Sequence, residues 1–357
     1  MRYFSALATV LLALHHGSHA LMDPSLYKNA VTSRNLTYHY YFSPAQPEKP
    51  TLLLCHGIPS TSYDWRYIVP VLEEKGYGVL APDMLGLGET AKPADPAAYV
   101  PSLISKDLVD LLDAESLGKV IAIGHDWGCK AISRLANYYP ERFLAYAFLA
   151  VPFAEITPPT DFQMYLDYVK RVYGYELYGY WSFFSAPDAN ELIQVHVDSF
   201  VSVAFPYDPT IWKTRWAPTG VLRQSLLEGY VAPLPAYMSE EDKEHFVGTF
   251  SRNGFEAPAN WYKIMTSQLS ARDDEQIPYE RALPPASAPI YFAATKYDYV
   301  CLPEIGYAVF EGEEFSKHNV THKEYDTDHW IILSKGDEVA HDLDAWIEGT
   351  AVSQASH

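Results

Sequence analysis

The sequence has little positive charge, and this shortage excludes several kinds of partner. Its 357 residues include 26 lysines and arginines against 45 aspartates and glutamates, so the formal net charge is −19. A protein of this charge is repelled by nucleic acid and by anionic membrane surfaces, and the charge favours solubility. We therefore expect no nucleic-acid partner.

Cysteine is also scarce, and histidine is scattered. Cys55, Cys129 and Cys301 are an odd number of thiols in a chain long enough to bury a sizeable core without crosslinks. We expect buried free thiols, since disulfide frameworks belong mainly to small secreted domains. The histidines lack the paired spacing of ligands on a helix or hairpin, so we expect no metal site and no cofactor.

No apolar run reaches the roughly 18–20 residues that span a bilayer. At the N-terminus, Arg2, the apolar stretch 4–14 and the small residues of Ser18-His19-Ala20 follow the order of a secretory signal peptide. We predict that residues 1–20 are removed and that the protein is secreted without further membrane insertion; an uncleaved signal anchor is the alternative. Two N-glycosylation sequences fit secretion, namely Asn35-Leu36-Thr37 and Asn319-Val320-Thr321.

Short apolar runs alternate with amphipathic stretches, a pattern typical of a mostly parallel sheet with crossover helices. The predicted strands are 36–42, 51–55, 78–81, 120–123, 144–151, 288–295 and 320–325, and the predicted helices are 103–112, 129–139 and 336–348. Between the predicted strands 144–151 and 288–295 lies a segment rich in Pro, Tyr, Trp and Phe, in which apolar and amphipathic stretches do not alternate. We predict an α/β core at 21–152 and 270–357, with a helical lid inserted at 153–269.

The stretch Gly124-His125-Asp126-Trp127-Gly128 lies between an apolar strand and a helix. Its glycines have the spacing of a nucleophile elbow, in which small residues let a sharp turn raise the central side chain above the sheet. The central residue here is Asp126, where serine or cysteine is usual. An ordinary strand-to-helix turn with an aspartate cap is the alternative.

An oxyanion hole is predicted beside this elbow. The loop His56-Gly57-Ile58-Pro59 follows an earlier apolar strand, and its tight glycine turn directs the backbone N–H of Ile58 into the site. The backbone N–H of Trp127 would be the second donor. Two such donors stabilise the oxyanion of a tetrahedral intermediate.

Two further residues complete a catalytic set. Asp298 and His329 each follow a late predicted strand, so the chain order from Asp126 is nucleophile, acid and histidine, as in this type of fold. Asp326 and Asp328 are competing acids, but immediate sequence neighbours rarely orient a histidine. We therefore select Asp298 as the acid.

These residues resemble the epoxide hydrolase branch of the α/β-hydrolases, over about residues 40–346. The matching motifs are the His-Gly-x-Pro loop, the His-Asp-Trp-Gly elbow, Pro140-Glu141-Arg142, Asn253-Gly254-Phe255, Asn260-Trp261-Tyr262 and the late Asp-His-Trp. The resemblance implies an α/β-hydrolase core with a helical lid, and a secreted, fungal-type member of the soluble epoxide hydrolase-like enzymes.

The resemblance also implies two lid tyrosines that stabilise the oxygen leaving carbon. Tyr175 in Tyr175-Glu176-Leu177-Tyr178 matches the first, although packing is the alternative role for any one tyrosine in so rich a segment. The second position falls on Phe246, which has no hydroxyl. Either another residue such as Tyr262 or Tyr237 replaces it, one tyrosine suffices, or the substrate is not an epoxide.

The carboxylate nucleophile restricts the reaction. At neutral pH it needs no deprotonation, which leaves His329 free to activate water in a later step. Attack on acyl carbon would give a mixed anhydride, whereas attack on alkyl carbon gives a stable ester. An alkyl carbon with a leaving group, as in an epoxide or a carbon–halogen bond, meets this requirement. The resemblance implies the first, so we predict hydrolysis of a small apolar epoxide to a vicinal diol through an ester on Asp126.

Two alternatives stay open. In a haloalkane dehalogenase, the indole of Trp127 would bind the departing halide, but the asparagine common after His-Gly is Ile58 here. A non-catalytic binding protein would have no need of Asp126, Asp298 and His329 together.

Overall fold

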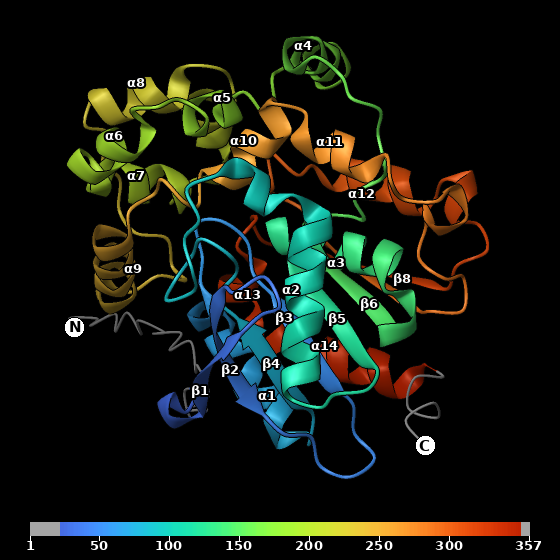
Figure 1. Ribbon diagram of the computed structural model, residues 1–357. Helices are drawn as coiled ribbons and strands as arrows, with labels where there is room; N and C mark the ends of the chain where they lie inside the picture. The colour runs from blue at the N-terminus through green and yellow to red at the C-terminus, as the bar shows by residue number, and fades with distance from the viewer. Residues whose placement is uncertain (1–21, 351–357) are drawn as a thin grey trace, which may run out of the picture.

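The structure is a computed structural model that describes residues 22–350. A central sheet has helices on both faces and a second helical layer above one end (Figure 1). The predicted signal peptide at 1–20 lies outside the described residues. No helix within the described part of the chain is long and apolar enough to cross a membrane.

The sheet has eight strands in the order β1-β2-β4-β3-β5-β6-β7-β8. β2 is antiparallel to β1 and β4, and all other neighbouring strands are parallel. The strands are β1 Tyr27–Val31, β2 Thr37–Ser43, β3 Thr51–Cys55, β4 Gly78–Pro82, β5 Val120–His125, β6 Phe143–Leu149, β7 Ile290–Thr295 and β8 Val320–Tyr325. This confirms the predicted α/β fold with a mostly parallel sheet.

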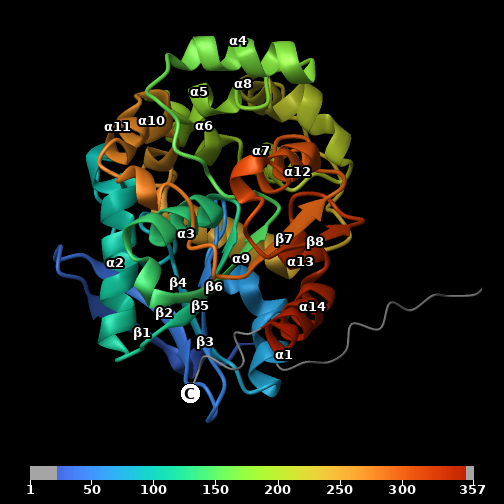
Figure 2. The same cartoon turned by 90° about the vertical axis from the view of Figure 1, so that its right-hand side faces the viewer.

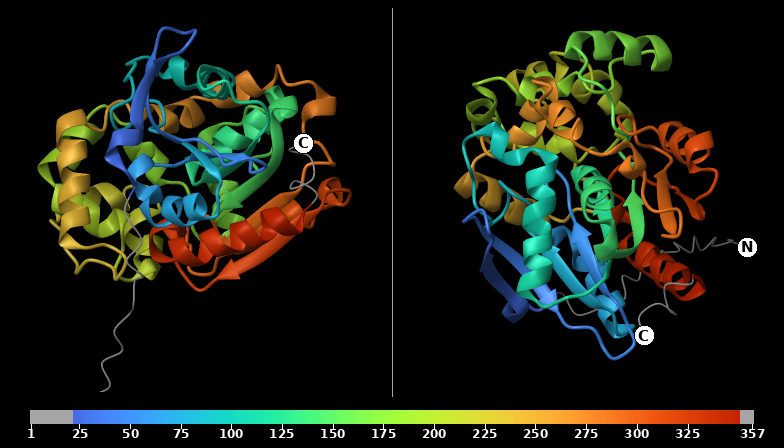
Figure 3. Two further views of the ribbon diagram at one scale, coloured as in Figure 1. Left: turned by 90° about the horizontal axis from the view of Figure 1, so that it is seen from below. Right: turned by 45° about the vertical axis from the view of Figure 1, so that its right-hand side comes forward.

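Helices cover both faces of the sheet, which explains the continuous apolar runs in β3, β5 and β7, where every residue is buried. Figure 3 shows α1 and α14 against one face and α2 and α3 against the other. The helices of this core are α1 Val69–Glu74, α2 Pro101–Ala114, α3 Trp127–Tyr138, α12 Pro303–Phe310, α13 Ile331–Ser334 and α14 Gly336–Gly349.

A layer of short helices connects β6 to β7 and lies over the end of the sheet where β5 runs into α3 (Figures 1 and 2). These helices are α4 Phe162–Tyr173, α5 Tyr180–Phe184, α6 Ala189–Val195, α7 Val197–Ala204, α8 Val221–Leu227, α9 Glu240–Asn253, α10 Asn260–Thr266 and α11 Leu269–Asp274. We call α4–α11 the lid. The predicted domain boundaries at 153 and 269 stay predictions.

One buried guanidinium fastens both chain crossings between core and lid. Arg134 of α3 donates to the carbonyl oxygens of Ala154 at 2.5 Å and Glu155 at 3.3 Å, on the segment that leaves the core. It also pairs with the carboxylate of Asp274, at the end of α11, at 2.6 and 2.7 Å. Both segments that join the lid to the core are thus bonded to α3.

The predicted strands and core helices are confirmed, with ends that differ by a few residues. Among the strands and α-helices of the core, β1, α1, α12 and α13 were not predicted. β1 is an edge strand with no fully buried residue, so its sequence lacks the apolar alternation of a strand. α1 has only six residues, too few to display a helical period.

Candidate active site

The turn between β5 and α3 holds Asp126 in a rare backbone conformation, with φ 53° and ψ −124°. A non-glycine residue at positive φ is strained by about 1–3 kcal/mol and persists only where its surroundings impose it. Here the surroundings include glycine contacts. A Cβ on Gly128 would lie 1.9 Å from the carbonyl oxygen of Cys55, and one on Gly124 would lie 2.7 Å from the backbone nitrogen of Cys129. The predicted elbow therefore has the backbone geometry of a nucleophile elbow.

The loop after β3 holds one oxygen of the Asp126 carboxylate. The backbone N–H of Ile58 donates to Oδ1 of Asp126 at 2.8 Å. Gly57 permits this approach, since a Cβ there would lie 2.0 Å from the same oxygen. Trp127 is the first residue of α3, and the first N–H groups of a helix have no partner within the helix. The structure thus places the predicted Ile58 donor on the carboxylate, and the Trp127 donor stays a prediction.

The other carboxylate oxygen faces His329. Nε2 of His329 lies 3.4 Å from Oδ2 of Asp126, and Nδ1 lies 2.6 Å from Oδ2 of Asp298. Oδ1 of Asp298 accepts from the backbone N–H groups of Val300 at 2.9 Å and Cys301 at 2.8 Å, which fixes the acid. The structure therefore brings Asp126, Asp298 and His329 together.

Asp326 and Asp328, the two other acids considered as partners of His329, contact other residues. Asp326 is exposed and pairs with Lys296 at 3.1 Å. Asp328 accepts from the Tyr237 hydroxyl and from the backbone N–H of Trp330, both at 3.0 Å. Burial raises the pKa of Asp328 to about 6.

The buried charges of the site support one another. Burial alone would raise the pKa of Asp126, but the contacts with His329 and the Ile58 N–H outweigh burial and lower it. Burial alone would lower the pKa of His329, but the negative charges of Asp298 and Asp126 raise it well above its ordinary value. The contacts of the site therefore favour the ionised form of Asp126 and the protonated form of His329.

A histidine that the sequence did not mark as functional positions the loop of the triad. Nε2 of His125 lies 2.8 Å from the backbone carbonyl oxygen of His329 and, as an N–H, donates to it. Burial lowers the pKa of His125 to about 4, so the ring stays neutral at physiological pH. Its place directly before Asp126 in the motif was the only sequence signal.

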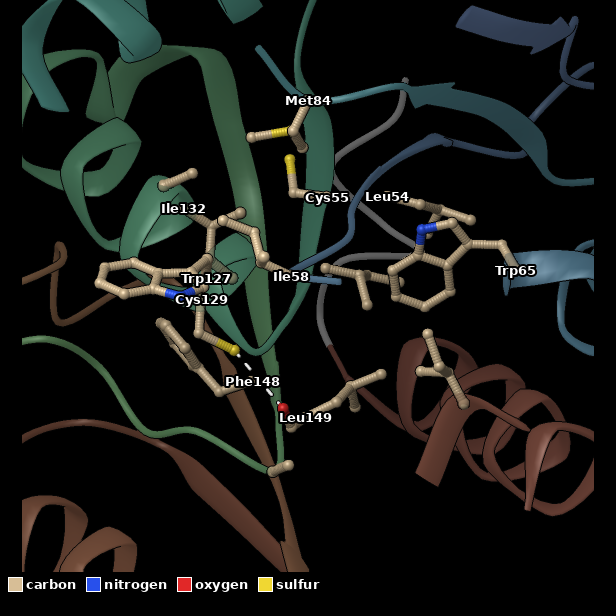
Figure 4. Packing of buried hydrophobic residues seen from close by; sticks show 14 of the residues in the cluster. Leu54, Cys55, Ile58, Trp65, Met84, Trp127, Cys129, Ile132, Phe148 and Leu149 are labelled. Atoms are coloured by element: carbon tan, nitrogen blue, oxygen red, sulfur yellow. Dashed lines mark hydrogen bonds between the residues drawn. The ribbon is translucent and has the colours of Figure 1, made fainter. Parts of the chain in front are cut away.

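Apolar packing supports the elbow from below. Figure 4 shows Trp127 and Ile58 beside Cys129, whose Sγ contacts the carbonyl oxygen of Leu149 at 3.5 Å. All three cysteines are free, and Cys55 and Cys129 are buried, as predicted. Cys301 is partly exposed.

Comparison with known proteins agrees with this geometry. The family model described as the alpha/beta hydrolase fold matches residues 50–335. The chain belongs to the α/β-hydrolase family. Bifunctional epoxide hydrolase 2 of Sus scrofa is 34% identical over 219 residues, which are 60% of this chain and 38% of that protein. Epoxide hydrolase srdG of Neurospora crassa is 27% identical over 345 residues, 89% of this chain and 94% of that protein.

A solved structure gives the same result. The crystal structure of epoxide hydrolase A from Mycobacterium thermoresistibile aligns with a TM-score of 0.74 at 25% identity, over 90% of this chain and 98% of that one. The chain therefore shares its fold with this solved epoxide hydrolase over most of its length. It spans only 38% of the length of the pig relative.

In the lid of this α/β-hydrolase, the tyrosine predicted to donate to the leaving oxygen already has a hydrogen-bond partner. The hydroxyl of Tyr175 donates to the backbone carbonyl oxygen of Tyr299 at 2.6 Å. Phe246 lies among other phenylalanines, with ring centroids 4.5 Å from Phe250 and 5.1 Å from Phe205. The role of Tyr175 as a donor stays a prediction.

Aromatic side chains from the lid cover the elbow of the hydrolase. The ring of Trp127 lies 5.1 Å from Tyr262, 5.5 Å from Trp181 and 6.1 Å from Trp261. Trp181 also lines a groove of about 500 Å³ together with Phe162 and other apolar residues of α4 and α10. The surroundings of Asp126 are thus suited to an apolar ligand.

Donor atoms of Asp298, Cys301 and His329 lie within 4.8 Å of one another, a grouping with the composition of a metal site. Two of these residues already share the 2.6 Å contact between His329 and Asp298. A metal ion would have to break that contact. We therefore assign the group to the triad, with the thiol as a neighbour.

Proposed function

We propose that this protein is an epoxide hydrolase that adds water across an epoxide to give a vicinal diol. The observation that carries the proposal is that the two oxygens of the Asp126 carboxylate have different contacts. Oδ1 of Asp126 is held by the N–H of Ile58 at 2.8 Å, while Oδ2 lies 3.4 Å from His329. The first oxygen is placed to become a stabilised oxyanion, and the second to attack carbon.

In the first step, Oδ2 of Asp126 attacks an epoxide carbon and the carbon–oxygen bond breaks. The lowered pKa of Asp126 keeps this nucleophile ionised at neutral pH. The product is an alkyl ester, and the departing oxygen takes up a proton.

In the second step, water hydrolyses the ester. Ester formation removes the Asp126 charge, and this charge is one of the two that raise the pKa of His329. The pKa of His329 therefore falls, so that more of the ring is neutral imidazole and free to take a proton at the moment when a base is needed. Asp298 orients it, and the N–H groups of Ile58 and Trp127 stabilise the tetrahedral oxyanion by about 3–4 kcal/mol per donor.

The substrate of this proposal is a small apolar epoxide, with water as the second reactant. The ring contacts around Trp127 and the groove beside Trp181 favour an apolar substituent. The names of the relatives point to the same class.

Trapping the ester tests the proposal. The His329→Gln variant, mixed with an epoxide panel, should gain the mass of one substrate on the peptide that contains Asp126. The Asp126→Ala variant should lose turnover completely, whereas Asp326→Ala, a change at an exposed carboxylate, should retain it. Halide release from haloalkanes without any ester from epoxides would instead favour a dehalogenase, and ligand binding without either product would favour a binding protein.

We also propose that the chain is a secreted, glycosylated protein of the fungal type. Both acceptor asparagines, Asn35 and Asn319, are exposed, and the Neurospora relative extends over most of the chain. N-terminal sequencing of protein from a secreting host should begin at Leu21, and glycosidase treatment should lower the mass. An intact N-terminus in the membrane fraction would favour the uncleaved anchor.

A further inference from the structure

Between lid helices α7 and α8 the chain makes a single turn of π-helix, η6 Trp212–Trp216. The carbonyl oxygen of Trp212 accepts from the backbone N–H of Ala217 at 2.8 Å, five residues further along the chain. Turns of this kind are rare and occur frequently at functional sites. Two consecutive residues of this turn contact the two loops that carry Asp298 and His329.

Trp212 lies against the ring of His329. The centroids of the two rings are 5.4 Å apart, and the ring planes are inclined by 52°. Trp212 is 4% exposed, its indole N–H donates to the carbonyl oxygen of Val203 in α7 at 2.8 Å, and its ring stacks on that of Trp216 at 5.8 Å. The indole is thus held by two contacts within the lid while it faces the histidine of the triad.

The other ring contacts of His329 come from the core. Its ring lies 5.0 Å from that of His125 and 5.4 Å from that of Trp330, which it meets edge to face. Within residues 22–350, Trp212 therefore provides the one ring that the lid places against this histidine.

The next residue of the π-turn contacts the loop of the acid. Nζ of Lys213 lies 4.2 Å from the ring centroid of Tyr299, which directly follows Asp298. The other charged residue of η6, Arg215, pairs with Glu228 at 3.3 Å. A cation as close to an aromatic ring as Nζ of Lys213 is attracted by the ring. The π-turn therefore contacts the loop of Asp298 through Lys213, in addition to the contact of Trp212 with the histidine.

The surroundings of His329 favour its positively charged form. Burial alone would lower its pKa, but the negative charges of Asp298 and Asp126 raise it well above its ordinary value. A cation within about 6 Å of a ring centroid is attracted by the ring, and indole attracts it more strongly than the other aromatic side chains do. The contact with Trp212 therefore acts in the same direction as the two carboxylates.

Three further titratable groups interact with His329. Burial raises the pKa of the Cys301 thiol to about 12 and lowers the pKa of His125 to about 4, so both groups are uncharged near neutral pH. Burial raises the pKa of Asp328 to about 6. Of these three groups, Asp328 is thus the one that can add a charge next to the histidine near neutral pH.

We propose that Trp212 is a positioning residue for the second step of the reaction, because it holds the ring of His329 in place and stabilises the positive charge that this ring gains from water. The assignment rests on the proposed ester on Asp126. Trp212 acts through His329 and makes no bond to the reacting atoms.

In that step, the oxygen of water bonds to the carbonyl carbon of the ester, and one proton of the water moves to His329. The bond between this carbon and the alkyl oxygen then breaks, and the proton on His329 passes to the alkyl oxygen to complete the diol. The second proton of the water leaves the Asp126 carboxyl group and replaces the proton that was taken up at ring opening. Since Asp126 carries no charge while the ester exists, the indole of Trp212 and the carboxylate of Asp298 stabilise the imidazolium.

The test uses the full-length protein, styrene oxide and rapid-quench mass spectrometry, which follows ester formation and ester hydrolysis separately at a series of pH values. At the upper plateau of the pH profile, Trp212→Leu should slow ester hydrolysis by about 10-fold, the size of one desolvated cation–π contact, and should change ester formation by less than about 2-fold. The hydrolysis rate rises with pH as His329 loses its proton. Since the indole favours the protonated ring, its loss should move the midpoint of this rise to lower pH by about 0.5–1 unit.

Two further variants separate this role from a general loss of packing. Trp212→Phe keeps a ring against His329 and should recover most of the hydrolysis rate and of the midpoint, and it tests the proposal even if the leucine variant does not fold. Trp346→Leu removes a buried tryptophan of α14 whose ring lies 5.5 Å from that of Tyr291 in the core sheet. It should lower the melting temperature without moving the midpoint.

An unchanged hydrolysis rate and midpoint in folded Trp212→Leu would overturn the role of Trp212 and leave the proposed function intact. Equal slowing of both steps with an unmoved midpoint would also overturn it, since a purely structural loss acts in that way. A wild-type protein that forms no ester would overturn the proposed function itself.

Discussion

The core and the lid of this molecule are packed by different kinds of side chain. The central strands of the core are aliphatic and wholly buried, and glycines allow backbone segments to meet at the elbow. The lid is packed by aromatic rings, as in the stack of Phe184 on Tyr262 at 4.4 Å. The nucleophile, the acid and the histidine all come from the core. The aromatic rings that surround Trp127 of the elbow come from the lid.

The residues of the elbow and those of the lid are therefore held in position by different kinds of contact. Asp126 is positioned by backbone contacts that leave no space for a single added methyl group at Gly57 or Gly128. Lid residues are positioned by ring contacts, which tolerate exchange when the neighbours repack. In the proposed reaction, the core therefore determines the attack by Asp126, while the lid surrounds the leaving group and the substrate.

A glycine-to-alanine substitution in each region should show the largest difference between the core and the lid. Gly128→Ala in the core would place a methyl group 1.9 Å from the carbonyl oxygen of Cys55, so we expect a loss of at least about 3 kcal/mol in the free energy of unfolding. Gly248→Ala in the lid helix α9 would meet only the Arg252 guanidinium at 3.4 Å. Since alanine favours a helix over glycine, it should stabilise the protein by up to about 1 kcal/mol.

Urea unfolding of both variants, read by circular dichroism, measures the two effects. Equal losses in Gly128→Ala and Gly248→Ala would show that the elbow is no more constrained than the lid, and the contrast between the two regions would then be wrong.

A carboxyl group at the boundary between the two regions gives a pH-dependent test. Asp328 of the core accepts from Tyr237 of the lid, and burial raises its pKa to about 6 from 3.8. The native state thus holds this proton more tightly than the unfolded state, and the resulting stability is present below pH 4 and is lost as pH rises through about 6. Relative to Asp328→Asn, the wild type should lose up to about 3 kcal/mol between pH 4 and pH 7.

The measurement is urea unfolding of both proteins at four pH values in that range. If the difference in the free energy of unfolding between the two proteins stays constant with pH, Asp328 titrates at its ordinary value. The boundary between core and lid would then be accessible to water.

A lid substitution should give the smallest effect and one that depends on the substrate. Trp181→Leu removes the indole that lies between the groove and Trp127. We expect kcat/KM for a bulky epoxide such as stilbene oxide to fall by about 10-fold, since an aromatic contact contributes about 0.5–1.5 kcal/mol beyond its buried area. The value for a small epoxide such as epoxybutane should change little. Tyr168→Leu, at a mostly exposed position of the same groove, serves as the control.

Equal losses for both substrates in Trp181→Leu would mean that this tryptophan supports the elbow and does not bind the substrate.

The same contrast explains how far the sequence could be interpreted. The core strands, the elbow at Asp126 and the order that leads to His329 were predictable because each depends on local spacing or on a continuous apolar run. The structure brings those residues together. The position of the Tyr175 hydroxyl was not predictable, because its bond to the carbonyl oxygen of Tyr299 joins segments more than a hundred residues apart. The proximity of Tyr262 to Trp127 also depends on lid packing.

The central claim is that Oδ2 of Asp126 enters the product and that water attacks the resulting ester. A single turnover in water labelled with oxygen-18, with enzyme in excess over the epoxide, tests this directly. We predict an unlabelled diol and one heavy oxygen in the peptide that contains Asp126. A labelled diol from the first turnover, with no label in that peptide, would mean that water attacks the epoxide directly and would contradict the claim.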